Sequence, residues 1–384
     1  MKLRSRRVAA LVALGLVAAA WLTWVTRLRP VDPRTGPRPV ALSDGWTLST
    51  PRAEGFDEQA LVTAAERLMD RPLNVHAILV ERHGRLVLEM YQGGPDRSVY
   101  SLLSTRQSFG PGTLHDVRSV GKTVTSLLYG VAFEQRKVPA PDAALDGSFP
   151  HLDGVAADNA RRIRVRDLLD MSSGLEWTEG RPGLNDELKL FWKTDVPTYV
   201  LDRPIKPAPG TRFNYNGGGT ALLAQLIADG TGKPLDEFAN ERLFAPMGIT
   251  RWAWLRDTPG RPMAFNGLRL RPRDLLKFGR LALEEGRWNG RQLVPADWIR
   301  DAWAPGLRTD VADFRYRAQW WSGTVSWRGR PIRWHAAFGN GGQRLFVVPQ
   351  LDLAVATTAG AYDELPTAIA VNEFIGDVVR SVAN

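Results

Sequence analysis

Arg118-Ser119-Val120-Gly121-Lys122 is the stretch that decides how this 384-residue chain is interpreted. The surrounding pattern predicts a helix over 117–133 with a mostly small and apolar interior. Positions i and i+3 of a helix share one face, with Cβ atoms about 5–6 Å apart, so the Lys122 amine reaches the Ser119 hydroxyl. A neutral amine accepts the hydroxyl proton, which requires the lysine pKa to fall from ~10.4 to about 7 through desolvation or a neighbouring cation. The alternative is a helix that holds both residues without chemistry.

Other nucleophile and metal chemistries find little support in the sequence. The chain has no cysteine, which excludes a disulfide scaffold, thiolate catalysis and Cys-ligated zinc. The five histidines show no H-E-x-x-H or other metal-ligand spacing, so neither a metal nor a cofactor is expected. His76 and His83 fall in a predicted hairpin, where a surface or packing role is expected. No serine stands in a G-x-S-x-G elbow, which argues against an α/β-hydrolase triad.

Two glycine-rich segments carry further candidates. In 213–219, Tyr215 precedes a run of glycines and an apolar helix. A tyrosine held there can relay a proton, and the alternative is a turn tyrosine beside a helix cap. In 338–343, glycines stand at the entry to a predicted strand, where they mark the close approach of a ligand or simply a tight turn.

The formal net charge of +9 is concentrated at the N-terminus. Residues 1–29 hold six basic side chains and no acidic one, so +9 less +6 leaves +3 for the rest of the chain. The nearly neutral body gives no reason to expect a nucleic-acid partner. Val8–Thr26 is uncharged, and a helix of this length spans about 28 Å, close to the ~30 Å core of a bilayer. We expect a signal anchor that leaves the body outside the cytoplasm, with a cleaved signal peptide as the alternative.

The rest of the chain divides into a linker and one enzyme-sized body. Residues 30–55 are rich in proline and are expected to form a tether. Within 56–384, the patterns predict a helix over 58–70, a hairpin around His83-Gly84, and strands followed by a closing helix near the C-terminus. Helical patterns fill about 140–300. Strands at both ends with helices between them predict an α+β fold, in which helices flank an antiparallel sheet and form an insertion subdomain.

These segments together resemble the serine β-lactamase/penicillin-binding-protein superfamily over roughly 55–380. Residues 118–122 match its S-x-x-K motif, and Tyr215 matches the tyrosine of its Y-x-N motif. The similarity is to the class C-like branch, which includes family VIII esterases and 6-aminohexanoate-dimer hydrolases. Further segments similar to this branch are 163–175, 244–249 and 267–275. The resemblance implies a β-lactamase/transpeptidase-like fold.

The resemblance also implies acyl-enzyme chemistry. Ser119 attacks a carbonyl, Lys122 takes its proton, and Tyr215 passes a proton to the leaving group. Backbone N–H groups of Ser119 and of the 341–343 strand entry are expected to form the oxyanion hole. Whether lysine or tyrosine acts as the base in acylation stays open. The residues expected to bind the substrate or the oxyanion are Asn216, Gly341, Gly342, Gln343 and Trp177, of which Trp177 has core packing as its alternative.

Two departures from the family motifs bear on the substrate. The asparagine of Y-x-N falls on Gly217, with Asn216 beside it, and no lysine stands shortly before Gly339, where the third motif has one. The missing lysine argues against β-lactam processing. We therefore expect an exported, periplasmic, membrane-attached serine hydrolase of small esters or amides. The alternatives are a DD-peptidase or β-lactamase, and a non-catalytic scaffold of the same fold.

Overall fold

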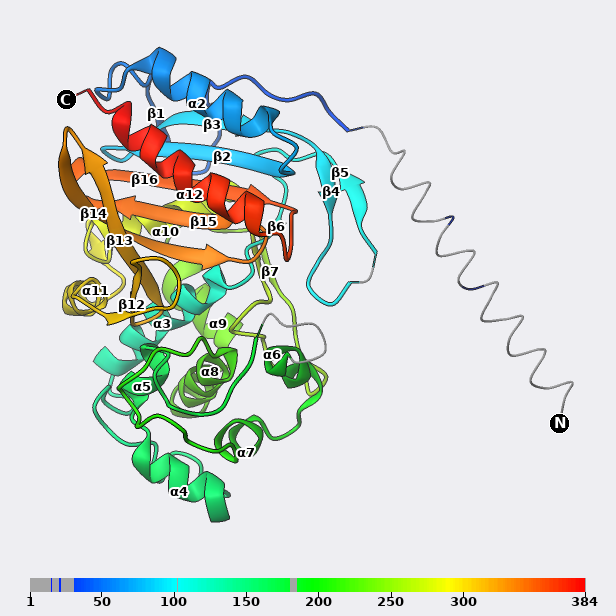
Figure 1. The fold of residues 1–384 in the computed structure, drawn as a ribbon, viewed down its shortest axis with the longest axis vertical. Helices are drawn as coiled ribbons and strands as arrows, with labels where there is room; N and C mark the ends of the chain where they lie inside the picture. The colour runs from blue at the N-terminus through cyan, green and yellow to red at the C-terminus, as the bar shows by residue number, and fades with distance from the viewer. Residues whose placement is uncertain (1–14, 16–20, 22–30, 102, 180–184, 384) are drawn as a thin grey trace, which may run out of the picture.

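A nine-stranded sheet forms the centre of the computed structural model, which describes residues 15, 21, 31–101, 103–179 and 185–383 (Figure 1). The strands of this sheet are β1 (Thr47–Leu48), β2 (Val75–Arg82), β3 (Arg85–Tyr91), β11 (Leu307–Arg308), β12 (Arg315–Arg317), β13 (Trp320–Trp327), β14 (Arg330–Gly339), β15 (Gln343–Val348) and β16 (Leu353–Ala359). Their order is β1-β3-β2-β16-β15-β14-β13-β12-β11. The short β1 runs parallel to β3, and the other neighbouring pairs are antiparallel.

Helices pack on both faces of the sheet and fill the middle of the chain. They are α2 (Glu58–Asp70), α3 (Val120–Glu134), α4 (Gly154–Arg162), α5 (Val165–Leu169), α6 (Asp186–Lys189), α7 (Val196–Leu201), α8 (Gly217–Thr231), α9 (Leu235–Ala239), α10 (Pro272–Leu283), α11 (Ala296–Ala302) and α12 (Leu365–Arg380). The small sheets consist of β4 (Gly94–Asp96) with β5 (Thr105–Gln107), β9 (Arg287–Trp288) with β10 (Arg291–Gln292), and β6 (His115–Asp116) with β8 (Leu268–Leu270) and β7 (Trp252–Trp254).

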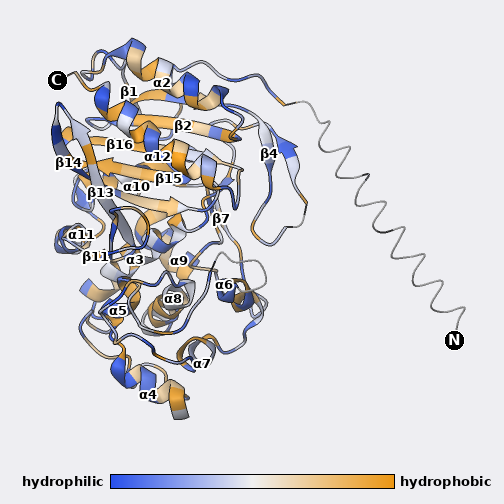
Figure 2. Ribbon diagram, viewed as in Figure 1, coloured by the Kyte–Doolittle hydropathy of each residue, from blue (hydrophilic) through white to orange (hydrophobic). Residues whose placement is uncertain are grey.

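The central strands are buried on both faces, which explains their continuous apolar runs. Along β2, Ile78 and Val80 belong to the core under α2 and α12, while Ala77 and Leu79 belong to the core shared with α3 and α10. This alternation follows from the period of two in a strand. Figure 2 shows the strands β2, β15 and β16 as predominantly hydrophobic. A sheet covered on both sides provides a rigid wall against which α3 is placed.

The α+β fold class is confirmed. The predicted helix over 58–70 is α2, whose first turn is capped by the Asp57 carboxylate accepting from the Ala60 N–H at 3.0 Å. The predicted hairpin consists of β2 and β3, with His83 in the left-handed conformation in the turn. In Figure 1, α12 at the C-terminus lies beside α2, and both cover the same face of the sheet. Strands from both ends of the chain therefore build one sheet, and α4 to α9 lie between them in the sequence.

The N-terminal region differs from a free tether where the structure describes it. The Thr35 N–H donates to the carbonyl of Tyr91, and β1 pairs with β3, so this stretch runs along the sheet edge. Trp46 is buried in the core. The predicted signal anchor, Val8–Thr26, lies almost entirely outside the described residues and stays a prediction. Within the described part of the chain, none of the helices has the length and hydropathy needed to span a bilayer.

Candidate active site

Ser119 stands at the start of α3, on the wall of a cleft of about 720 Å³. The preceding residue, Arg118, has a φ of 52°, which a non-glycine residue adopts only where its surroundings impose it. Its N–H donates to Asp116 Oδ1 at 3.3 Å, and its guanidinium lies 3.9 Å from the centre of the Tyr362 ring. Gly339 packs directly against this turn, because a Cβ there would collide with the carbonyl oxygen of Val117. The turn is therefore held on several sides with Ser119 at the cleft.

Lys122 is buried one turn along α3, next to the serine. Its Nζ donates to Ser119 Oγ at 3.0 Å, to Glu187 Oε2 at 2.8 Å and to the carbonyl of Phe265 at 3.1 Å. Burial by itself lowers the pKa of Lys122, but the charge of Glu187 and other acidic groups nearby outweighs it, and the pKa is raised. Lys122 is therefore an ammonium in the resting site, whereas proton acceptance by its amine, as expected from the sequence, requires the neutral form. The reason is Glu187, which lies on α6 and has no sequence signal that links it to Lys122.

Glu187 occupies the place that a side chain at position 217 would fill. A Cβ added to Gly217 would clash with Glu187 Oε2 and would lie 3.1 Å from Glu179 Oε1. The other oxygen of Glu187 accepts from Asn266 Nδ2 at 3.0 Å. The departure from Y-x-N at Gly217 thus has a structural reason, since the glycine makes room for a carboxylate beside the lysine.

Tyr215 completes the group from the turn before α8. Its side chain hydrogen-bonds to that of Ser119, and Lys122 Nζ lies 4.7 Å from the centre of its ring. Burial raises the pKa of Tyr215, although Lys122 and the bond to Ser119 oppose the shift, so the phenol keeps its proton at neutral pH. The structure therefore brings together Ser119, Lys122 and Tyr215, which are separated by up to 96 positions in the sequence.

A second carboxyl group, Glu179, lies behind Tyr215. Its Oε1 accepts from Trp177 Nε1 at 2.7 Å and from the N–H of Gly217. Burial and the negative charge of Glu187 raise the pKa of Glu179 well above its ordinary value. Two neighbouring carboxyl groups do not both ionise readily, because their negative charges repel each other. Near neutral pH, Glu179 therefore tends to keep a proton, while Glu187 is paired with Lys122.

Aromatic rings line one side of the cleft. Trp321 stacks on Tyr215 with ring centres 5.9 Å apart, and Phe338 stacks on Trp321 at 5.3 Å. The guanidinium of Arg344 closes this stack 4.3 Å from the centre of Phe338. These residues come from β13, β14 and β15, so neighbouring strands of the sheet build a flat apolar wall that leads to Ser119.

Carboxylates dominate the remaining lining. The acidic residues among the described lining residues are Glu179, Glu187, Asp310, Asp363 and Glu364. Arg344 is the one basic side chain in the described part of the lining, and burial lowers its pKa to about 10, which leaves it charged at neutral pH. Three of these five acids are already compensated, because Asp363 pairs with Arg97 at 3.0 Å, Glu187 pairs with Lys122 at 2.8 Å, and Glu179 tends to keep its proton. Asp310 and Glu364 remain against Arg344, which leaves a small excess of negative charge in the described lining, beside the apolar wall.

The other residues expected in the site divide into two groups. Trp177 and Gly341 line the cleft, together with Gly339 and Asn340. Gln343 is not among the lining residues, because its amide bonds both main-chain groups of Ala359.

Asn216 and Gly342 also lie outside the lining. The Asn216 side chain caps α8 by accepting from the N–H of Gly219 at 3.1 Å. Gly342 is packed between Ala359 and Thr367, whose side-chain carbons would lie 3.0 Å from an added Cβ. The part of this strand entry that lines the cleft is 339–341, two residues earlier in the chain than the expected 341–343.

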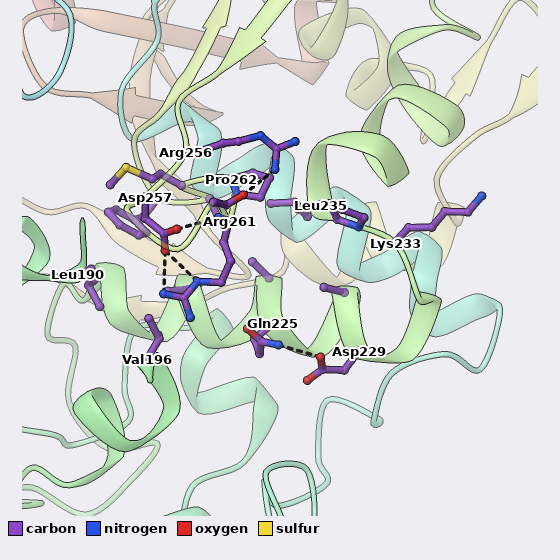
Figure 3. Close-up of a pocket in the computed structure, with 18 of the residues that line it drawn as sticks. Leu190, Val196, Gln225, Asp229, Lys233, Leu235, Arg256, Asp257, Arg261 and Pro262 are labelled. Carbon is purple, nitrogen blue, oxygen red and sulfur yellow. Dashed lines mark hydrogen bonds and ion pairs between the residues drawn. The ribbon is translucent and has the colours of Figure 1, made fainter. Parts of the chain in front are cut away.

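A second cavity, of about 500 Å³, lies between α8 and the loop that precedes β8 (Figure 3). Both arginines of its lining form ion pairs with nearby carboxylates. Arg256 pairs with Asp236 at 2.5 Å, and Arg261 pairs with Asp257 at 2.7 Å. Ser119, Lys122 and Tyr215 are absent from its lining, so this cavity is separate from the cleft at Ser119.

Comparisons with known proteins agree with this geometry. The sequence profile of the Beta-lactamase family matches residues 64–379. The chain is 24% identical over 345 residues to a 6-aminohexanoate-dimer hydrolase of Paenarthrobacter ureafaciens, covering 84% of this chain and 79% of that protein. It is 31% identical over 187 residues to a D-aminopeptidase of Brucella anthropi, covering 47% of this chain and only 33% of that protein. The fold superposes on a class C beta-lactamase with a TM-score of 0.61 at 16% identity, over 83% of this chain and 94% of the other.

Proposed function

Since the chain belongs to the Beta-lactamase family and is a hydrolase of that family, we propose that it cleaves small amides through an acyl-enzyme on Ser119. One observation carries the proposal: the Ser119 hydroxyl lies within hydrogen-bonding distance of Lys122 Nζ at the wall of an open cleft. Two relatives with amide substrates, the 6-aminohexanoate-dimer hydrolase and the D-aminopeptidase, support amides over esters.

The proton route follows from the ion pair. An ammonium cannot accept the serine proton, so Lys122 must give up one proton as it receives another. Glu187 Oε2, 2.8 Å from Nζ, is placed to take it. Ser119 then attacks the carbonyl as its proton moves to Nζ and a lysine proton moves to Glu187. Tyr215, kept as a phenol, is positioned to protonate the leaving amine.

The substrate we propose carries an ammonium group. Asp310 and Glu364 of the lining attract a cation, and the stacked rings of Tyr215, Trp321 and Phe338 offer an apolar surface for its hydrocarbon part. Arg344, at the far end of this stack, suits a terminal carboxylate. A short amino-acid oligomer with free termini has this distribution of charge.

We also propose that the body works outside the cytoplasm, attached to the membrane by residues 8–26. The support is the uncharged length of this segment and the excess of basic residues before it. A fusion of alkaline phosphatase to the C-terminus tests the topology, because this reporter folds only in an oxidising compartment. An inactive fusion would contradict the proposed export.

The test of the chemistry uses the full-length chain and its Ser119→Ala variant. A fluorophosphonate probe should label the wild type and leave the variant unlabelled. Amino-acid p-nitroanilides with a free ammonium group should be hydrolysed at least 10-fold faster, as kcat/KM, than their N-acetylated counterparts. Equal labelling of both proteins would overturn the acyl-enzyme mechanism. Equal rates on the two anilides would overturn the substrate class, and rapid turnover of nitrocefin would favour the β-lactamase alternative.

A further inference from the structure

Two buried histidines face each other at the junction of β2, β4 and β6. His76 and His115 are both fully buried, and His76 Nδ1 lies 2.9 Å from His115 Nε2. Asp96 reaches the same place from β4, with Oδ1 4.0 Å from His115 Nε2. Each residue comes from a different strand, and each is buried. The sequence spacing of the three residues gave no sign of this arrangement.

In each ring, the nitrogen that faces away from the other histidine donates a hydrogen bond. His76 Nε2 lies 2.9 Å from Asn74 Oδ1, and the orientation of that amide is fixed because Asn74 Nδ2 donates to the carbonyl of Pro95 at 2.8 Å. His115 Nδ1 lies 3.0 Å from the carbonyl oxygen of Asp116. A carbonyl oxygen only accepts, so both of these nitrogens carry a hydrogen.

It follows that, in neutral rings, the two nitrogens that face each other, His76 Nδ1 and His115 Nε2, both carry a lone pair and no hydrogen. Two lone pairs 2.9 Å apart repel each other unless a positive charge lies between or beside them. An additional proton is one such charge, and a metal ion bound by both nitrogens is another. Neutral imidazole is the form that binds a metal ion.

We propose that His76 Nδ1, His115 Nε2 and the Asp96 carboxylate bind a divalent transition-metal ion of the Zn²⁺ type. The ligand atoms all lie within 4.8 Å of one another. Metal–ligand bonds of ~2.0–2.1 Å in a tetrahedral site place ligand atoms about 3.3 Å apart. The two nitrogens must therefore separate by a few tenths of an ångström, and the carboxylate must approach by somewhat more, which small side-chain rotations provide.

The partners outside the three ligands match those of a metal site. Ligating histidines commonly donate their other N–H to a carbonyl or carboxylate, as both do here. The Asp96 carboxylate is oriented in turn by the hydroxyl of Tyr362, which donates to Oδ1 at 2.6 Å. The stacked ring of Phe109, 4.0 Å from that of His76, shields the group.

The place of the ion indicates a structural role. β6 ends at Asp116, whose carboxylate accepts from the N–H groups of Val99 and Arg118, and Ser119 follows three residues later. An ion that joins β6 to the start of β2 in the main sheet fixes the strand that leads into the turn before Ser119. The ion lies within the protein interior and takes no part in the reaction.

Metal content and metal-dependent stability of the full-length chain test the proposal without any assay of turnover. After dialysis against a chelator, the wild type should take up one equivalent of Zn²⁺ or Co²⁺ and show the d–d absorption of a low-coordinate Co²⁺ site. Zn²⁺ should raise the Tm. The Asp96→Asn variant, which keeps the shape of the side chain, should bind Co²⁺ at least 100-fold more weakly. His151→Gln, which changes an exposed histidine, is the matched control and should bind as the wild type does.

Two results would overturn the metal site. One is a wild type that binds no more Co²⁺ than Asp96→Asn and whose Tm is unchanged by Zn²⁺ or chelator. The other is a protein incubated with Zn²⁺ at neutral pH in which ¹⁵N NMR still shows one doubly protonated imidazole, since a proton and not the ion would then supply the positive charge. Because neither measurement involves Ser119, the proposal fails or stands independently of the hydrolase function.

Discussion

Lys122 and Lys277 are two buried lysines with similar partners and different surroundings. Each follows a polar residue by three positions on its helix, and each amine contacts a carboxylate and a main-chain carbonyl. Lys277 Nζ lies 3.0 Å from Asp274 Oδ1 and 3.1 Å from the carbonyl of Met247, and both members of this ion pair are fully buried.

The difference lies in the partners of the two amines. The two side-chain partners of Lys122, Ser119 and Glu187, both line the cleft, so a molecule bound in the cleft can contact them. Burial and pairing therefore do not by themselves make a lysine catalytic. What distinguishes the two is a hydroxyl group within reach and access from outside.

Removing the hydroxyl should have the largest effect. Ser119→Ala should lower kcat by about 10⁴-fold or more, because no other group in the cleft can form the acyl-enzyme. Ser126→Ala is the matched control, since Ser126 is a buried serine on the same helix whose hydroxyl has no partner. Its kcat should stay within about 3-fold of the wild type. Mass spectrometry of the trapped acyl-enzyme checks both, and an acylated Ser119→Ala protein would contradict the assignment.

Replacing each lysine by methionine separates chemistry from stability. Lys122→Met should lower kcat by about 10³-fold, because it removes the proton relay. Lys277→Met should leave kcat per folded molecule nearly unchanged but lower the free energy of unfolding by about 1–3 kcal/mol, because Asp274 Oδ1 stays buried without the ammonium and Arg271 remains as the partner of Oδ2. Denaturant titration and active-site titration measure the two effects. Equal losses of kcat in both variants would remove the distinction between the two lysines.

Changing the carboxylate partners tests the proposed relay more finely. Glu187→Gln keeps an oxygen for Lys122 but cannot take a proton, so kcat should fall by about 10²-fold. The raising influence of Glu187 on the pKa of Lys122 also disappears. Asp274→Asn is the counterpart at the structural lysine and should change stability without changing kcat. A Glu187→Gln enzyme with wild-type kcat would show that Lys122 passes its proton elsewhere.

The smallest effect is expected at Asp170, which is a buried carboxylate without a lysine partner. Burial raises its pKa to about 6, while the N–H of Ala318 donates to it at 2.8 Å. Its folded-state pKa thus exceeds the unfolded value of about 3.9, so its contribution to stability is greatest below pH ~4 and is lost as the pH rises through about 6. Asp170→Asn should therefore stabilise the protein by about 1–3 kcal/mol at pH 8 and hardly at all at pH 4. Thermal unfolding at the two pH values checks the sign, and a stabilisation larger at pH 4 would contradict it.

The sequence supported more of the fold than of the site. The limits of α2, the β2–β3 hairpin and the strands β15 and β16 followed from local periodicity. β14 did not, because Pro331 and His335 interrupt its apolar run, and pairing with β13 and β15 overrides that local pattern. Ser119 and Lys122 could be found because they lie one helical turn apart. Glu179 and Glu187 carry no such pattern, since they reach the lysine from another segment of the chain.

By itself, the sequence determined that the side chains of Ser119 and Lys122 meet, because the helical period places positions i and i+3 on one face. It also determined the α+β class, since the runs of strand and helix are local properties. The tertiary structure decided the charge of Lys122, through a carboxylate 65 positions away, and the use of Gly217 to make room for that carboxylate. It decided as well that His76 and His115 meet, through strands that are distant in the chain. Protonation states and ligand sets depend on distances of a few ångströms between segments, and only the folded chain sets those distances.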